Sequence, residues 1–153
     1  MSILSDELTT STELAPLVAA NDFEGILTVL NRKDISVLGN LSVHIVKRYV
    51  SLIGLRLPIL DSPAQSCREF NLALEDFKDT GFDLTNTYIY AKVISVLDAL
   101  VAETLIPDFT EVHKLTLLSF GNKLISRAEQ LNINPTIADI SAAIFNDDGT
   151  RKI

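Results

Sequence analysis

"TNTYIYAKVISVLDALVAET", residues 85–104, is the stretch that decides the fold of this chain. Its apolar residues recur every three or four positions, which is the period of an amphipathic helix. Thr85 or Asn86 can cap the first turn, because a short polar side chain accepts a hydrogen bond from a backbone N–H there. We expect this longest helix to lie at the centre of the core, with these residues facing inward: Ile89, Val93, Val96, Leu97, Leu100 and Val101.

The surrounding region, residues 88–106, is also the most apolar part of the chain. Lys92, Asp98 and Glu103 interrupt it, so a bilayer span would have to bury all of these charges. The region therefore predicts a core helix and no contact with a membrane.

Shorter helices are predicted on both sides, from cap residues and from apolar residues at helical spacing. Near the C-terminus, Ser126 with Glu129 forms a capping-box pattern, and Thr136 with Asp139 forms a weaker acidic version of it. Helices are expected at residues 2–8, 13–20, 23–31, 43–55, 63–80, 109–120, 127–131 and 137–145. One small strand is compatible with residues 35–38.

The predicted fold class is all-α, a compact bundle of about five to seven helices with at most one minor strand pair. The last two helices are too short to be stable alone, so we expect them to dock on the bundle around the central helix.

Length and composition predict one domain. The chain has 153 residues, of which 47% are apolar and only 6 are Gly and 5 are Pro, a balance typical of a compact, ordered fold. We expect a single helical domain over residues 1–145 and a solvated C-terminal tail over residues 146–153. The tail contains NDDG, residues 146–149, which lacks the alternating ligands and the closing glutamate of a calcium loop.

The charge balance argues against nucleic-acid binding. The chain has 13 basic and 20 acidic residues, with a formal net charge of −7, which repels phosphates unless a basic face is segregated. The densest basic groups are isolated pairs, Arg32 with Lys33 and Lys47 with Arg48. The single cysteine, Cys67, cannot form an internal disulfide, and MSILSDELTT is no secretion signal, so folding in a cytoplasm is expected.

Catalytic and metal-binding residues are scarce in this sequence. His44 and His113 are the only histidines, so a Cys/His metal cluster is not available. No nucleophile elbow, phosphate loop or dinucleotide-binding turn occurs. We therefore predict no enzyme activity, no cofactor, no metal and no catalytic residues. A deep polar pocket holding either histidine beside a carboxylate would revive an enzyme hypothesis.

One surface is a candidate for binding a partner. Acidic residues line the outer face of the helix predicted at 63–80, and Phe82, Tyr88 and Tyr90 surround the start of the next helix. A solvated acidic face and ordinary core packing are the alternatives for these two groups. The candidate partner-binding residues are Glu69, Glu75, Asp76, Asp79 and Tyr88.

Several segments resemble a family of small helical phage proteins encoded among virion and tail genes. They are ELTT (7–10), APLVAANDFEGILTVLN (15–31), FDLTN (82–86), LDALVAETLI (97–106), SRAEQL (126–131) and ADISAAI (138–144). Members commonly continue ELTT with Asp-Pro and a Gly-Tyr pair, whereas Ser11 and Thr12 follow here. The resemblance covers most of the chain, matches 33–66 only loosely, and assigns no catalytic residues.

What the resemblance implies is a non-enzymatic bacteriophage structural or assembly protein, a helical component associated with the tail or head. It would act through contacts with other virion proteins, with possible self-association, and would be found in the virion or the host cytoplasm. The alternative is a small acidic phage protein that binds and modulates a host protein through its acidic helix face.

Overall fold

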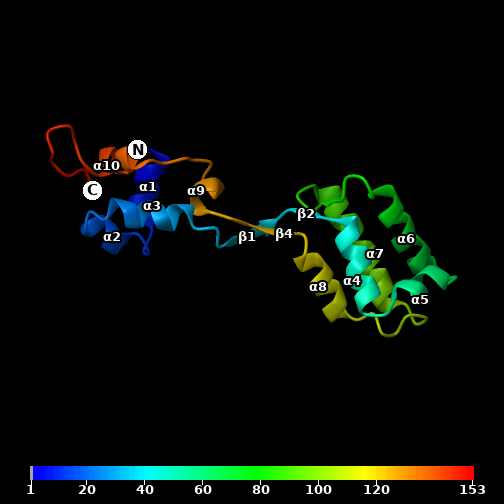
Figure 1. Ribbon diagram of the computed structural model, residues 1–153. Coiled ribbons are helices and arrows are strands. Elements are labelled where there is room, and N and C mark those ends of the chain that lie inside the picture. Colours follow the sequence, from blue (N-terminus) through cyan, green and yellow to red (C-terminus); the bar gives the residue numbers. More distant parts are fainter. Residues whose placement is uncertain (1) are drawn as a thin grey trace. The chain divides into compact units, whose positions relative to one another are not determined.

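The computed structural model describes residues 2–153, which contain ten helices and four short strands. The chain forms two compact units (Figure 1). Unit 1 consists of Met1–Ser36 and Leu124–Ile153, and unit 2 consists of Val37–Lys123. Unit 2 is therefore an insertion between two segments that fold together.

Unit 1 is built from five short helices. They are α1 (Ile3–Thr10), α2 (Ala15–Ala19), α3 (Phe23–Asn31), α9 (Arg127–Gln130) and α10 (Ile137–Ile144). Helix α3 packs against α2, α9 and α10, and α1 packs against α2 and α10. Ile26, Leu30, Ile140 and Ile144 lie at the centre of its core, fully buried.

Unit 2 contains the other helices. They are α4 (Val43–Leu52), α5 (Arg56–Asp61), α6 (Gln65–Asp76), α7 (Thr87–Ala102) and α8 (Glu111–Ser119). Helix α7 is the longest, and it contacts both α6 and α8. Its inward residues Val93, Val96, Leu97 and Leu100 are buried in the core of this unit, as the sequence predicts.

Four short strands accompany the helices. Strand β2 (Asn40–Leu41) pairs antiparallel with β3 (Phe82–Asp83), with Asn40 opposite Asp83 and Leu41 opposite Phe82. Strand β1 (Ile35–Leu38) pairs with β4 (Asn122–Ile125), and the boundary between the two units crosses both of these strands. The sequence predicts at most one strand pair, so the structure has one pair more than expected.

The chain enters and leaves unit 2 at one place. The Gly39 N–H donates a hydrogen bond to the Gly121 carbonyl oxygen, at 2.8 Å. Gly121 is buried, and a Cβ at this position would lie 3.2 Å from Leu41 Cβ and 2.4 Å from Leu84 Cδ1. Glycine is therefore required here by the close approach of the two chain segments rather than by its backbone angles.

The mostly helical fold class is confirmed, but the predicted number of five to seven helices is wrong. One reason is Gly54, whose φ of +78° ends α4 early and separates α5 from it. A second reason is that five to seven is fewer than the segments expected to be helical, and the short ones at residues 13–20 and 127–131 each form a helix of their own, α2 and α9.

The predicted docking site of the C-terminal helices is also wrong. Helices α9 and α10 pack on α3 in unit 1, whereas the longest helix, α7, belongs to unit 2. The apolar residues of α10 are buried against the N-terminal segment, because Leu8, Leu14 and Val18 supply the nearest unpaired apolar surface.

Residues 146–153 are expected to be a solvated tail; residues 146–152 are exposed, but the segment also makes specific contacts with unit 1. Arg151 pairs with Phe145 in an isolated β-bridge, and its guanidinium lies 5.6 Å from the Phe145 ring centroid. The same guanidinium donates hydrogen bonds to the Val18 carbonyl and to Asn21 Oδ1, each at 2.6 Å. Ile153 packs against the core of unit 1.

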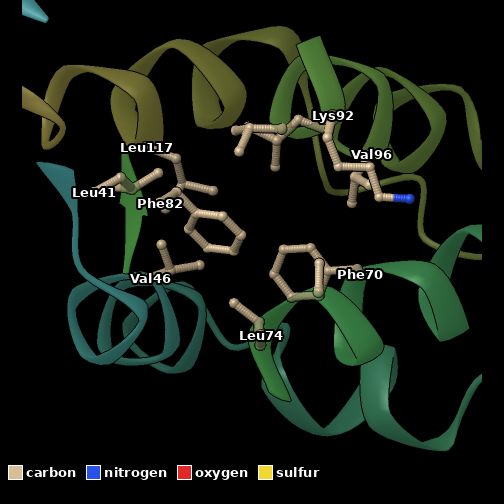
Figure 2. Close-up of a pocket in the computed structure, with 11 residues that line it drawn as sticks. Leu41, Val46, Phe70, Leu74, Phe82, Lys92, Val96 and Leu117 are labelled. Atoms are coloured by element: carbon tan, nitrogen blue, oxygen red, sulfur yellow. The ribbon is translucent and has the colours of Figure 1, made fainter. Parts of the chain in front are cut away.

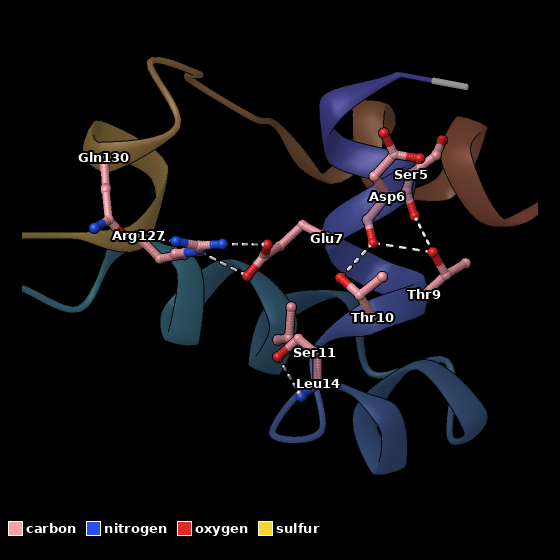
Figure 3. A network of polar contacts seen from close by, with 9 residues as sticks. All are labelled: Ser5, Asp6, Glu7, Thr9, Thr10, Ser11, Leu14, Arg127 and Gln130. Carbon is pink, nitrogen blue, oxygen red and sulfur yellow. Dashed lines mark hydrogen bonds and ion pairs between the residues drawn. The ribbon is translucent and has the colours of Figure 1, made fainter.

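An ion pair also joins the two segments of unit 1. Arg127 Nε and Nη2 each donate a hydrogen bond of 2.8 Å to the two carboxylate oxygens of Glu7 (Figure 3). The Glu7 side chain is only 11% exposed. This bidentate geometry is the strong form of an arginine–carboxylate contact, and it fixes α9 against α1.

Candidate protein-binding surface

The residues predicted to bind a partner lie on α6 and at the start of α7. Glu69 is half-buried and accepts a hydrogen bond from Gln65. Glu75, Asp76 and Asp79 are exposed near the C-terminal end of α6. Tyr88 is 86% exposed in the first turn of α7. The short connection between the two helices places Tyr88 at the same end of this helix pair as Asp76 and Asp79.

Basic side chains reduce the charge of this acidic surface. Lys78 Nζ lies 2.7 Å from Glu75 Oε1, and its hydrogen bond lowers the pKa of the Glu75 carboxyl. The positive charge of Lys47 acts in the same direction. Asp76 and Asp79 are the exposed acids that remain, so this surface is smaller than the sequence pattern indicates.

The aromatic residues near the start of α7 separate into two groups. Phe82 is buried and its ring centroid lies 4.8 Å from that of Phe77. Tyr90 is half-buried and packs on the core of unit 2. Only Tyr88 is available at the surface, which leaves it as the one aromatic candidate of the three.

A second surface, which sequence reasoning missed, is formed by α4 and α8, which the Tyr49 ring links. We define the α4–α8 face by Ile45, Tyr49 and Leu52 on α4 and by Val112, Thr116 and Phe120 at α8. Tyr49 joins the two helices, because its ring centroid lies 5.4 Å from that of Phe120 and 6.2 Å from that of His113, with edge-on geometry. Aromatic pairs favour this arrangement.

The two helices of this face are antiparallel. The hydrogen bond from Gly39 to Gly121 lies just before α4 and just after α8, so α4 begins where α8 ends. Ile45 is therefore at the same end as Phe120, and Leu52 is at the same end as Val112. Figure 1 shows α4 and α8 running in opposite directions.

Exposure increases along the face. At the Ile45 end, Ile45 is 41% and Phe120 is 40% exposed, whereas at the other end Leu52 is 77% and Val112 is 68% exposed. The sequence pattern predicts Ile45 to face inward, which is wrong, because the buried stripe of α4 is formed by Val43, Val46 and Val50. Exposed apolar side chains on these two helices make the α4–α8 face a candidate interaction site.

His113 has a structural role beneath this face. Its Nδ1 accepts a hydrogen bond from the Thr110 N–H, at 3.2 Å, and so caps the start of α8. Its ring also lies against Phe109, with centroids 5.7 Å apart. The other histidine, His44, is exposed on α4. Neither therefore lies in a deep polar pocket beside a carboxylate.

The cavities of the two units offer no convergent set of reactive groups. Unit 2 encloses an apolar cavity of about 20 Å³, towards which Val46, Phe70 and Phe82 are directed (Figure 2). Lys92 lines it with its aliphatic stem. Its lining offers no polar atom that could bind a ligand or hold an ordered water.

Unit 1 has an open groove of about 760 Å³ between the start of α1, residues 133–135 and α10. Its two charged groups are already engaged, because Asp139 accepts a hydrogen bond from the Thr136 N–H and Lys152 donates one to the Ala142 carbonyl. Within residues 2–153 no three His, Cys, Asp or Glu side chains come close enough to hold a metal ion.

Among residues 2–153, no helix has both the length and the apolar character needed to span a membrane. Comparisons with family models, with curated proteins and with solved structures give no match to this chain.

Proposed function

We propose that this chain is a non-enzymatic structural or assembly protein of a bacteriophage particle, associated with the tail or head. It binds other virion proteins through the α4–α8 face of unit 2. The observation that carries the proposal is the exposure of Leu52 on α4 and Val112 on α8, at 77% and 68%. The resemblance to small phage proteins supports the part of the proposal that names a bacteriophage particle.

The physical argument rests on the hydrophobic effect. When a partner covers exposed apolar side chains, the complex is stabilised by roughly 25 cal/mol for each Å² of apolar area removed from water. These side chains stand on helices that are anchored in the core through Val43, Val46, Val50 and Leu117, and Tyr49 links the two helices, so a partner would order little of the chain on binding. A preorganised surface binds more tightly for the same area.

The test is mass spectrometry of purified particles of a phage that encodes this chain, with the copy number measured against the major capsid protein. Presence at a fixed copy number supports the proposal, and absence from purified particles contradicts it. A phage carrying Leu52→Glu should lose the protein from its particles.

Leu72→Glu is the matched control for that substitution. Leu72 is 61% exposed on α6, so the same change of side chain occurs away from the α4–α8 face. Particles should retain this variant. Equal loss of both variants would show that incorporation does not depend on the α4–α8 face.

A second candidate function is a small acidic phage protein that binds and modulates a host protein. It is favoured by Tyr88, 86% exposed, at the same end of the α6–α7 pair as the acidic residues Asp76 and Asp79. A pull-down from host lysate should then yield one stoichiometric host protein, and Asp76→Asn with Asp79→Asn should abolish its capture. The same protein captured equally by the double variant would contradict this role of the acidic surface.

A further inference from the structure

The last residues of the chain seat Arg151 in a site that three other parts of unit 1 form. Its guanidinium donates hydrogen bonds of 2.6 Å to Asn21 Oδ1 and to the Val18 carbonyl oxygen, and it lies over the Phe145 ring, 5.6 Å from the ring centroid. We define Val18, Asn21 and Phe145 as the arginine site and residues 150–153 as the strap. We propose that the arginine site binds an extended, arginine-containing segment of another protein, and that the strap occupies it as an internal ligand.

The arginine site is held by the core of unit 1 rather than by the strap. Val18 is buried in that core. The Phe145 ring packs edge-on against Phe23, with ring centroids 6.2 Å apart. Asn21 turns the chain between α2 and α3 with a φ of +55°, a conformation that Asn adopts more readily than most residues. The site is therefore preformed, which lowers the ordering cost of binding a ligand.

The strap is less firmly held than the core. Thr150, Arg151 and Lys152 are exposed, and Ile153 is only half-buried. Besides the contacts of Arg151, the Lys152 N–H attaches the strap by a hydrogen bond of 2.6 Å to the Ile144 carbonyl oxygen. Segments with few buried apolar contacts and exposed hydrogen bonds open locally at a low cost in free energy. Another segment can therefore replace the strap while the rest of unit 1 stays folded.

The strap also leaves space beside it that a better ligand would fill. A mostly apolar groove of about 390 Å³ adjoins the arginine site, and this volume is typical of clefts that bind a ligand. Arg151 and Ile153 form one wall of the groove, and the other lining residues are Leu8, Thr9, Ala15, Val18 and Ala19. We therefore expect the partner to place its arginine where Arg151 lies and a large apolar side chain two residues later, where Ile153 lies.

The geometry of the site selects arginine over lysine. Nη1 of Arg151 donates to Asn21 and Nη2 donates to Val18, so two nitrogen atoms of one planar group are used at once above an aromatic ring. A lysine ammonium is a single point charge and cannot reproduce this fork. The formal net charge of −7 also favours the approach of a basic segment.

The first experiment is an NMR titration of the isotope-labelled full chain with the peptide GTRKF, which has the sequence of residues 149–152 followed by phenylalanine in place of Ile153. The peptide should displace the strap of the wild-type chain, with a dissociation constant on the order of 1 mM. The Arg151 Nε–H signal should then move towards that of a free arginine. A signal that does not move at about 10 mM peptide would overturn the proposal.

Arg151→Ala frees the arginine site in the full chain. This variant should bind GTRKF about 10-fold more tightly than the wild-type chain, because the strap no longer competes at a high local concentration. The peptide GTKKF, with lysine in place of the arginine, should bind the variant at least about 10-fold more weakly than GTRKF. Equal affinities of the two chains for GTRKF, or of the two peptides for the variant, would overturn the proposal.

Two asparagines of unit 1 provide matched variants of the site. Asn21 and Asn132 have positive φ angles of +55° and +57°, so glycine can replace either of them without backbone strain. Combined with Arg151→Ala, Asn21→Gly should weaken GTRKF binding about 5-fold or more, because a hydrogen-bond acceptor is lost. Asn132→Gly, outside the arginine site, should leave the binding unchanged. Equal effects would show that binding follows the stability of unit 1 rather than the site, and would overturn the proposal.

A second copy of this chain is the other source of the strap sequence. If copies exchanged their straps, sedimentation equilibrium would show a wild-type dimer that Arg151→Ala dissociates. That result would overturn the assignment of the site to a different protein, whereas a monomeric chain that binds GTRKF supports it. Because the arginine site belongs to unit 1, this inference goes beyond the proposed function of the α4–α8 face and fails or stands independently of it.

Discussion

The ion pair between Glu7 and Arg127 joins residues that are 120 positions apart in the sequence. The hydrogen bond from Arg127 lowers the pKa of the Glu7 carboxyl, burial opposes this effect, and the charge attraction adds to it. The direction of the shift means that the ionised pair stabilises the folded state. Its contribution is present above the unfolded pKa of about 4.3 and is lost as the pH falls through the lowered folded value.

We therefore predict that Glu7→Gln destabilises unit 1 by about 1–2 kcal/mol at pH 7. The difference from wild type should shrink at a second, acidic pH below the lowered folded pKa of Glu7, because the wild-type carboxyl is then protonated as well. Urea unfolding followed by circular dichroism at both pH values measures this. Glu13→Gln is the control in the same unit, because its ion pair with Arg32 is about half exposed and should contribute nothing measurable. If Glu7→Gln lowered the free energy of unfolding by the same amount at both pH values, the stabilising role assigned to the Glu7–Arg127 ion pair would be contradicted.

A second prediction at the residue scale concerns the apolar cavity of unit 2. Val46→Ile adds one methylene group to a side chain that lines the cavity. We expect the free energy of unfolding to rise by about 0.5–1 kcal/mol, because the added group buries apolar surface in space that is already present.

Val50→Ile serves as its control. Val50 is on the same helix, is fully buried, and does not line the cavity, so the same change should lower stability by about 1 kcal/mol or more through overpacking. Thermal unfolding of both variants measures these changes in stability. Stabilisation by both, or by neither, would show that the cavity does not control the outcome.

At the scale of elements, the start of α7 depends on one side chain. Asn86 Oδ1 accepts hydrogen bonds from the N–H groups of Tyr88 and Ile89, at 3.0 and 3.2 Å. We expect Asn86→Ala to destabilise unit 2 by about 1 kcal/mol, because two helix N–H groups lose their partner. Thr87→Ala, one residue later, should have no such effect. If chemical denaturation showed that Asn86→Ala and Thr87→Ala lose equal stability, Asn86 would not be the cap that stabilises the start of α7.

The starts of helices are the most predictable feature of this fold. The sequence indicates caps at Thr85 or Asn86, at Ser126 and at Thr136, and the structure shows that Asn86, Ser126 and Thr136 each accept a backbone hydrogen bond at a helix start. A cap is a local interaction, so the residues that form it stand next to each other in the sequence. The end of α4 is not predictable in this way, because the turn at Gly54 interrupts an apolar pattern that continues to Leu55.

The α4–α8 face is less predictable than the caps. Leu52 and Val112 are ordinary apolar residues within helical segments, and periodicity alone assigns such residues to a core. Which of them remain exposed depends on how two helices, separated by more than fifty residues in the sequence, are oriented by Tyr49. The candidate acidic residues, in contrast, could be placed on a surface from the sequence because ionised groups are rarely buried.

At the scale of the whole molecule, the two units have separate apolar cores. One core consists of residues from both ends of the chain, and the other consists of residues between Leu41 and Leu117. The sequence prediction of one domain over residues 1–145 concerns cooperative unfolding, so it remains a prediction that calorimetry tests. No local pattern marks the boundary, because β1 and β4 continue across it.

We expect two transitions in differential scanning calorimetry of the full chain. Each substitution should lower only the transition of its own unit, Glu7→Gln in unit 1 and Asn86→Ala in unit 2, because the cores share no buried residue. One transition that both substitutions lower equally would instead support a single cooperative domain.

The hydrogen bond between Gly39 and Gly121 has a mechanical consequence. When the chain is stretched from its two ends, tension passes through unit 1, since both chain ends belong to it. The inserted unit bears no load until α1, α2 and α3 have separated from α9 and α10. An optical trap should therefore record the unfolding of unit 1 first. The unfolding of unit 2 follows and extends the chain by on the order of 300 Å. A chain arranged in this way keeps its α4–α8 face folded under forces that have already opened the rest of the molecule.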